Sequence, residues 1–272
     1  MTNPRTYELG RMSWTEAREA AADNPVVLIP VGAIEQHGPH LPLHEDAIVA
    51  DHVAKQVAAA TGALVAPVMN YGHSPMFAAY AGTLSLRRET LTAVMVDICE
   101  GLVSHGFRRL VFVDNNGGNQ ASVMAAAFEM RTKHGILMGS LYPWQLGYQL
   151  MRSAYDDPDK VYGHGAEPEL SAMLVMFPEQ VQHDRIEGGE LQGIEGWRPH
   201  SYNGVAVPGY DVPGTVYWDF SDVSRSGVSG DTSVASEETG KVWVERVIGF
   251  CTAFVREFDA NTKDTSWAQQ PE

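Results

Sequence analysis

Apolar and polar positions follow two periods along this chain, one typical of buried strands and one typical of amphipathic helices. Continuous apolar runs of strand length predict strands that are covered on both faces. These runs lie at 26–31 (VVLIPV), 63–68, 110–113 (LVFV) and 136–142. Apolar residues three and four positions apart predict helices. These helices are expected over 46–60, 88–105, 119–134 and 236–258, and a capping box of Ser13 and Glu16 predicts a short one before the first strand.

The alternation of strands and helices predicts a three-layer α/β/α fold with a mainly parallel sheet. The sequence has neither an internal repeat nor a recognisable linker, so we expect residues 1–272 to form a single domain. The stretch 186–231 differs from the rest, because it is rich in Gly, Pro and Trp and has little periodicity. Such a stretch is long for a loop inside a compact domain, which predicts irregular structure packed around a site.

Composition and charge exclude several classes of protein. The chain has 19 Lys and Arg against 34 Asp and Glu, a formal net charge of −15, which repels nucleic-acid phosphates and anionic lipid headgroups. Uninterrupted apolar segments are too short to cross a bilayer. Two cysteines, Cys99 and Cys251, are too few for a disulfide framework or a thiolate metal site, and both fall inside predicted helices. We therefore expect a cytoplasmic protein that acts on a small molecule, without nucleic acid or membrane as a partner.

Residues with metal-binding chemistry gather after the first predicted strand, in GAIEQHGPHLPLHED (32–46). In parallel α/β sheets, ligand sites lie beyond the carboxyl ends of the strands. Glu35 and His37 are two residues apart in a Gly- and Pro-rich loop, and Asp46 at the start of the next helix can turn back to meet them. Imidazole and carboxylate ligands without sulfur suit Zn²⁺, Mn²⁺ or Fe²⁺. The alternative is a polar loop whose His and Glu side chains cap nearby helices.

Segment 32–46 resembles the signature of the creatininase (creatinine amidohydrolase) family. Four further segments resemble that family's landmarks in the same order, over about residues 10 to 260. These are AGTLSL (81–86), DNNGGN (114–119), HGAEPELS (164–171) and SGVSGD (226–231). The resemblance implies the family's α/β fold and a metal-dependent hydrolase, often hexameric, that opens cyclic amides or cleaves formamides with a metal-activated water.

The resemblance also implies roles for individual residues. Glu35, His37 and Asp46 match three metal ligands, with Asp46 as the bridge between two ions. The implied cofactor is a divalent metal, zinc or manganese with iron as a further option, at one or two ions per subunit. The implied assembly is a homo-oligomer, by resemblance a hexamer.

Asn116 departs from the family pattern, because the family's fourth ligand at this position is a histidine. An amide oxygen is a poorer ligand for Zn²⁺ than imidazole, so we expect Asn116 to contact the substrate instead. Creatininase proper has a metal-binding glutamate where this chain has Gly118, so we do not expect creatinine as the substrate. His44, Glu45 or Glu167 could complete the ligand set, and Glu167 is the preferred ligand for the second ion.

Further residues are predicted to act on the substrate. His164 matches a family position near the substrate carbonyl, and its alternative is a surface-loop histidine. Glu167 is the expected catalytic carboxylate beside His164. Glu169 is more strongly expected to be a carboxylate at a helix N-terminus, stabilised by the helix macrodipole. His73 and Ser74, after the second predicted strand, are expected to line the pocket.

Two functions are compatible with these residues. The first is a metal-dependent hydrolase of a small cyclic amide or formamide, or of a cyclic ketone of inositol-type catabolism by C–C hydrolysis. The second is a metal-impaired family member that binds a small molecule without turnover, and it rests on Asn116 alone.

Overall fold

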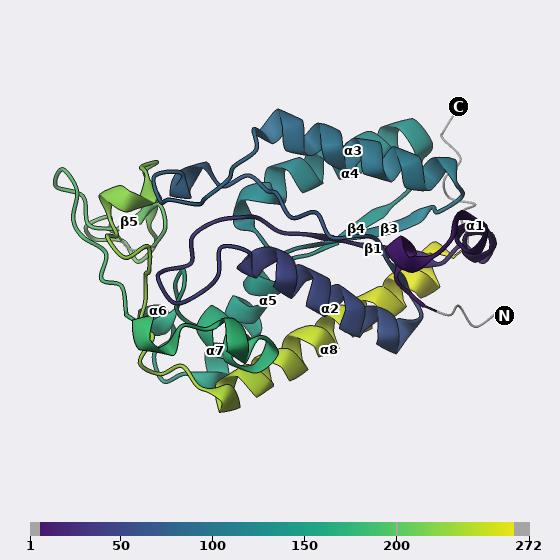
Figure 1. Ribbon diagram of the computed structural model, residues 1–272. Helices are drawn as coiled ribbons and strands as arrows, with labels where there is room; N and C mark the ends of the chain where they lie inside the picture. Colours follow the sequence, from purple (N-terminus) through teal and green to yellow (C-terminus); the bar gives the residue numbers. More distant parts are fainter. Residues whose placement is uncertain (1–5, 200, 264–272) are drawn as a thin grey trace.

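Four parallel strands form the centre of the computed structural model, which describes residues 6–199 and 201–263 (Figure 1). In sheet order they are β2 (Leu64–Val65), β1 (Val26–Val31), β3 (Arg109–Asp114) and β4 (Met138–Leu141). In the central strand, Val27 pairs with Leu64 on one side and Leu110 on the other. The order places the carboxyl ends of β1 and β3 side by side, which is where segments 32–46 and 114–119 begin.

Helices cover both faces of this sheet, which confirms the predicted three-layer α/β/α fold. Figure 1 shows α3 and α4 above the sheet and α2, α5, α7 and α8 below it. The upper layer is α3 (Arg88–Ser104) and α4 (Gln120–His134). The lower layer is α2 (Glu45–Thr61), α5 (Pro143–Leu150), α7 (Glu169–Met176) and α8 (Glu237–Thr262), with the one-turn α6 (Pro158–Val161) nearby. The helix α1 (Trp14–Ala22) begins at the predicted capping box of Ser13.

Two apolar clusters fill the spaces between the layers. Successive residues of β1 point to opposite faces of the sheet. Val26 and Leu28 therefore join the lower cluster, between the sheet and helices α2 and α8. Val27 and Ile29 join the upper cluster, between the sheet and helices α3 and α4. This explains why the whole of β1 is apolar and buried. The free thiols follow the same division and are buried as predicted, Cys99 in the upper cluster and Cys251 in the lower.

The structure differs from the predicted elements at two strands and two short helices. The fourth strand covers Met138–Leu141 instead of 136–142. The second strand covers only Leu64–Val65 instead of 63–68, and the short helices α5 and α6 were not predicted. Both begin with a proline and are too short to show an apolar period. Segment 186–231 is irregular as predicted, apart from short turns and a hairpin of β5 (Gly204–Val205) and β6 (Gly214–Thr215). Among the described residues, none of the helices has the length and apolar character needed to cross a membrane.

Candidate metal centre and active site

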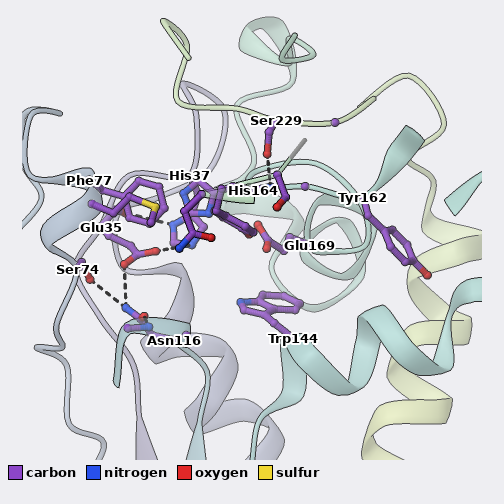
Figure 2. Close-up of a pocket in the computed structure, with 18 of the residues that line it drawn as sticks. Glu35, His37, Ser74, Phe77, Asn116, Trp144, Tyr162, His164, Glu169 and Ser229 are labelled. Carbon is purple, nitrogen blue, oxygen red and sulfur yellow. Dashed lines mark hydrogen bonds and ion pairs between the residues drawn. The ribbon is translucent and has the colours of Figure 1, made fainter. Parts of the chain in front are cut away.

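A cavity of about 1890 Å³ opens at the carboxyl ends of β1 and β3 (Figure 2). The lining includes the loop after β1 with the start of α2, residues 73–77, the loop after β3, and parts of α5, 159–169 and 186–231. The predicted residues Glu35, His37 and Asp46 all border it. The site therefore lies where a parallel sheet places its ligands, beyond the carboxyl ends of the strands.

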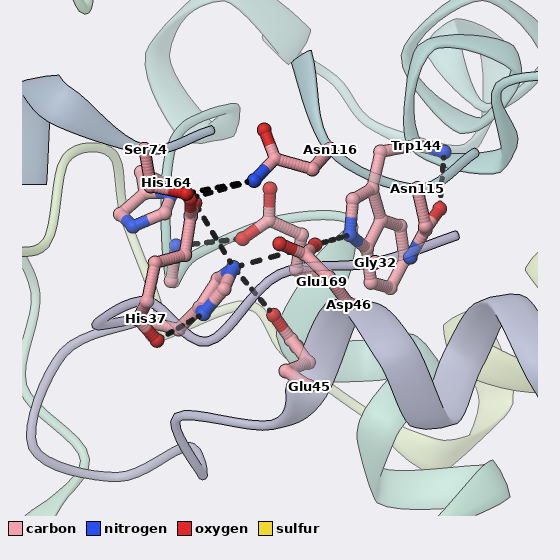
Figure 3. Close-up of polar contacts among 12 residues, drawn as sticks. Gly32, His37, Glu45, Asp46, Ser74, Asn115, Asn116, Trp144, His164 and Glu169 are labelled. Carbon is pink, nitrogen blue, oxygen red and sulfur yellow. Dashed lines mark hydrogen bonds and ion pairs between the residues drawn. The ribbon is translucent and has the colours of Figure 1, made fainter. Parts of the chain in front are cut away.

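His37 lies at the centre of the polar side chains in this cavity (Figure 3). Its Nδ1 is 3.2 Å from the backbone oxygen of Glu35, and because a carbonyl only accepts, Nδ1 carries the hydrogen. The other ring nitrogen, Nε2, faces three carboxylates. It lies 3.0 Å from Glu45 Oε2, 3.6 Å from Asp46 Oδ1 and 3.7 Å from Glu35 Oε1.

This arrangement requires a positive charge between the side chains. In a neutral imidazole with Nδ1 protonated, Nε2 presents a lone pair, and so do the carboxylate oxygens. Without a metal, a proton meets the requirement: burial opposes it, but the charges of Glu45 and Asp46 raise the pKa of His37 well above its usual value. A divalent cation meets it equally, because a metal-binding histidine usually donates its other N–H to a carbonyl, as His37 does.

The carboxylates around His37 leave ligand positions open. Within the described residues, both oxygens of Glu45 and the Oδ2 of Asp46 are buried and accept no hydrogen bond. Two compact sets of possible ligands share His37: one adds Glu35 and His164, the other adds Glu45 and Asp46, each with ligand atoms within 4.8 Å of one another. Buried carboxylate and imidazole donors without sulfur fit Zn²⁺ or Mn²⁺.

Asn116, the N-cap of the turn at Gly117–Asn119, closes the Glu35 side of the cluster. Its Oδ1 accepts a hydrogen bond of 2.6 Å from the backbone N–H of Gly118, which fixes the orientation of the amide. Its Nδ2 consequently donates to Glu35 Oε2 at 2.8 Å and to Ser74 Oγ at 3.0 Å. The amide oxygen is thus turned away from the metal ligands. Burial and the charge of Asp46 nevertheless raise the pKa of Glu35 to about 8.

His164 is buried next to His37, so the surface-loop alternative is excluded. Its ring stacks on Phe77 at 4.2 Å between centroids and lies 4.5 Å from the ring of His37. Its Nε2 donates to the backbone oxygen of Gln36, which leaves the lone pair on Nδ1. Burial and the neighbouring His37 hold the pKa of His164 well below its usual value. His164 is therefore a neutral base.

Glu167 lies away from the cavity, which corrects its prediction as a metal ligand and catalytic residue. Its carboxylate accepts hydrogen bonds from Tyr155 and from Ser171, and Glu167 is not among the described residues that line the cavity. Glu169, two residues on, borders the cavity instead. Its oxygens accept from the Gly165 N–H at 2.7 Å and the Tyr148 hydroxyl at 3.0 Å, and burial with the charge of Glu45 raises its pKa well above the usual value.

The remaining predicted residues also border the cavity. His73 and Ser74 line it, and His73 is fixed by donating from Nδ1 to the backbone oxygen of Leu86 at 2.8 Å. Gly118 must be a glycine here, because a Cβ on it would lie 1.8 Å from the backbone oxygen of His73. Trp144, in the unpredicted helix α5, donates from Nε1 to Asp46 Oδ1 at 3.1 Å and so orients that carboxylate.

Comparison with known proteins shows to which family the chain belongs. The family model described as creatininase (creatinine amidohydrolase) matches residues 10–255, which is most of the chain. The chain belongs to the creatininase family. It is accordingly a creatininase-family hydrolase, as the resemblance of segment 32–46 implied.

Curated relatives in the creatininase family act on different substrates. A creatinine amidohydrolase of Pseudomonas putida is 29% identical over 270 residues, covering 92% of this chain and 96% of the relative. A mycofactocin precursor peptide peptidase of Mycolicibacterium smegmatis is 30% identical, covering 83% and 82%. A 3-dehydro-scyllo-inosose hydrolase of Thermotoga maritima is 26% identical, covering 94% and 85%.

Solved creatininase structures share the fold of this chain. One described as "Creatininase Mn" has a TM-score of 0.71 at 29% identity, covering 93% of this chain and 98% of its own. A mutant creatininase described as "Zn-Zn type" has a TM-score of 0.69 at 30% identity with the same coverage. Manganese and zinc forms of the family therefore exist, which agrees with the donor set around His37.

Proposed function

We propose that the protein is a metal-dependent hydrolase that adds water to the carbonyl carbon of a cyclic amide or formamide and breaks the C–N bond. One observation carries this proposal: His37 Nε2 faces three buried carboxylates where the cavity begins, with the neutral base His164 beside it. The creatinine amidohydrolase and the mycofactocin peptidase support it, because both names describe cleavage of an amide-type bond.

The residues that would hold the cation are His37 and Asp46, with Glu35 and Glu45 on either side. When bound, a divalent cation would polarise the substrate carbonyl and make water more acidic. His164 accepts the proton of the attacking water at Nδ1, because its Nε2–H is already donated to Gln36. The same nitrogen then returns the proton to the leaving amine, so the step balances without a further acid.

Surrounding residues hold these groups in place and exclude water. Trp144 orients Asp46, and Phe77 covers one face of the His164 ring. The Tyr148 hydroxyl and the Gly165 N–H together fix the carboxyl group of Glu169 at the cavity wall. Burial of all these side chains strengthens each charge interaction relative to water.

The size of the cavity bears on the substrate. At about 1890 Å³ it exceeds the roughly 300–1,000 Å³ that is usual for small-molecule sites. A single small ring would fill little of it, so substrates that carry a substituent on the amide belong in any test. Tyr202, whose ring lies 5.7 Å from that of His164, and Trp218 belong to segment 186–231, border the cavity and would contact such a substituent.

A second candidate reaction is C–C hydrolysis of a cyclic diketone. Two observations favour it: the inosose hydrolase relative, and the replacement of the family's histidine by Asn116. Water attack on a ketone carbonyl uses the same base, His164. The difference lies in the leaving group, because a carbanion must be stabilised as an enolate and needs a hydrogen-bond donor on its oxygen.

Turnover with and without metal tests the proposal. Chelated protein reloaded with Mn²⁺ or Zn²⁺ is assayed on cyclic amides, formamides, substituted peptide amides and cyclic diketones. We expect one amide class to be hydrolysed only with metal, and His164→Ala to lower kcat about 10²–10⁴-fold. The exposed His183, outside the cavity lining, gives the control His183→Ala, which should keep full activity. Metal-independent turnover overturns the proposal, and metal binding without any turnover supports the non-catalytic alternative.

A further inference from the structure

Glu45 is the feature of this site that the general account leaves unexplained. It is the first residue of α2 and is fully buried. Among the described residues its one close polar partner is His37, whose Nε2 lies 3.0 Å from Oε2 and donates to it only when that nitrogen is protonated. A buried carboxylate is unfavourable without a positive partner, and the His37 ring is the side on which a proton or a cation would meet Glu45.

The position of Glu45 at a helix start does not account for its contacts. Carboxylates that the helix dipole stabilises usually lie at the surface or accept a backbone N–H of the first turn. Glu45 does neither, and the N-cap residue His44 makes no side-chain capping bond either. The carboxylate instead points from the N-terminal end of α2 towards the ring of His37 (Figure 3).

The distances match those between neighbouring ligands of one ion. Two ligands at about 2.1 Å from a cation, with an angle of 90–110° between them, are roughly 3.0–3.4 Å apart. Glu45 Oε2 lies 3.0 Å from His37 Nε2, and Asp46 Oδ1 lies 3.6 Å from the same atom. Glu45 is thus placed at least as well as Asp46 to bind an ion that His37 also binds.

On the opposite side of the cluster, Asn116 occupies one oxygen of Glu35, Oε2, while Oε1 lies 3.7 Å from His37 Nε2. The Gly118 N–H holds Asn116 so that its NH₂ group, which has no lone pair to give, faces Glu35 Oε2 at 2.8 Å. A cation held by that oxygen would meet the amide hydrogens of Asn116. A neutral donor therefore occupies the place next to Glu35 where a ligand would be needed.

We propose, on the basis of the proposed function, that this chain binds one divalent cation per subunit through His37, Glu45 and Asp46, and that Asn116 excludes a second ion at Glu35. Glu45 is then a ligand beyond the three, Glu35, His37 and Asp46, that the family resemblance implied. By contrast, the mutant creatininase with a related fold is described as "Zn-Zn type". Glu35 remains in the pocket, held by Asn116 at Oε2, and borders the cavity that would take the substrate.

Titration calorimetry of chelated full-length protein with Mn²⁺, repeated with Zn²⁺, tests this inference. We expect one ion per wild-type chain, and about tenfold or greater weakening of Kd in Glu45→Gln. The matched control is Glu237→Gln, at the first position of α8, where the carboxylate is exposed and faces solvent. It should bind metal like the wild type. Asn116→His should raise the stoichiometry towards two ions.

Several results would overturn the inference while the proposed hydrolase stands. These are two ions per wild-type chain, or a Kd within about twofold of wild type in Glu45→Gln. The wild-type stoichiometry needs no variant, so it decides the ion count even if Glu45→Gln does not fold. A wild-type chain that binds no metal but still turns over substrate overturns the proposed function as well.

Discussion

Replacing Asp114 by asparagine should remove a large part of the pH dependence of stability. Asp114 ends β3 and is fully buried beneath the site. Its Oδ1 accepts from Asn119 Nδ2 at 2.8 Å and its Oδ2 from Gln120 Nε2 at 2.6 Å. Burial outweighs these bonds and raises the pKa of Asp114 to about 8. Asparagine keeps the shape and the Asn119 bond, and Gln120 can rotate its amide to accept from the new NH₂.

The magnitude follows from proton linkage. The folded protein binds the Asp114 proton more tightly than the unfolded chain, whose aspartates titrate near pH 4. The stabilising effect of that proton is therefore complete at low pH and is lost as pH rises towards 8. The loss amounts to about 1.4 kcal/mol per pH unit, or about 4 kcal/mol between pH 5 and pH 8. Asp114→Asn should gain that much relative to wild type over the same range.

Urea denaturation of chelated protein at fixed concentration, from pH 5 to pH 8.5, measures this difference. Chelation matters because a bound cation would itself stabilise the ionised carboxylates nearby. Asp97→Asn, on the exposed face of α3, is the control, and its curve should stay parallel to wild type since that side chain is hydrated in both states. A difference between Asp114→Asn and wild type that stays constant with pH would refute the reasoning.

Three further predictions concern the site and the assembly. His37→Ala and Asp46→Ala should both lose bound metal in titration calorimetry. In the metal-free state, His37→Ala should have the lower melting temperature of the two, because only this variant leaves the buried carboxylates without a positive partner. Equal metal affinity to wild type in either would contradict the site. Asn116→His should bind metal more tightly but lose kcat/KM on the native substrate, and a rise in both would mark Asn116 as a degraded ligand. Light scattering should show a homo-oligomer, and a 29.7 kDa monomer at micromolar concentration would contradict it.

The layers of the fold were predictable because they depend on local patterns. The uniformly apolar run of β1 is buried on both faces, and α2 ends at Gly62, whose φ of 78° suits a residue without Cβ. The helix α5 was missed, because eight residues behind a proline give too short a pattern. Its Trp144 contact with Asp46 depends on packing between distant segments, which periodicity does not describe.

The site was predictable in its centre and less so at its edges. Glu35, His37 and Asp46 share one segment, so the sequence brings them together. Glu167 and Glu169 are two residues apart in one motif, and only the contacts with Ser171 and Gly165 decide which carboxylate reaches the cavity. The two glutamates are chemically identical in the sequence, and the direction of each side chain depends on where α7 begins.

Anomalous diffraction at the manganese absorption edge, from crystals of the Mn²⁺-loaded protein, tests the metal centre most directly. The account predicts one strong peak per subunit at about 2.0–2.2 Å from His37 Nε2, within reach of Glu45 and Asp46. A loaded crystal without a peak at His37, or with its strongest peak elsewhere on the chain, would contradict it.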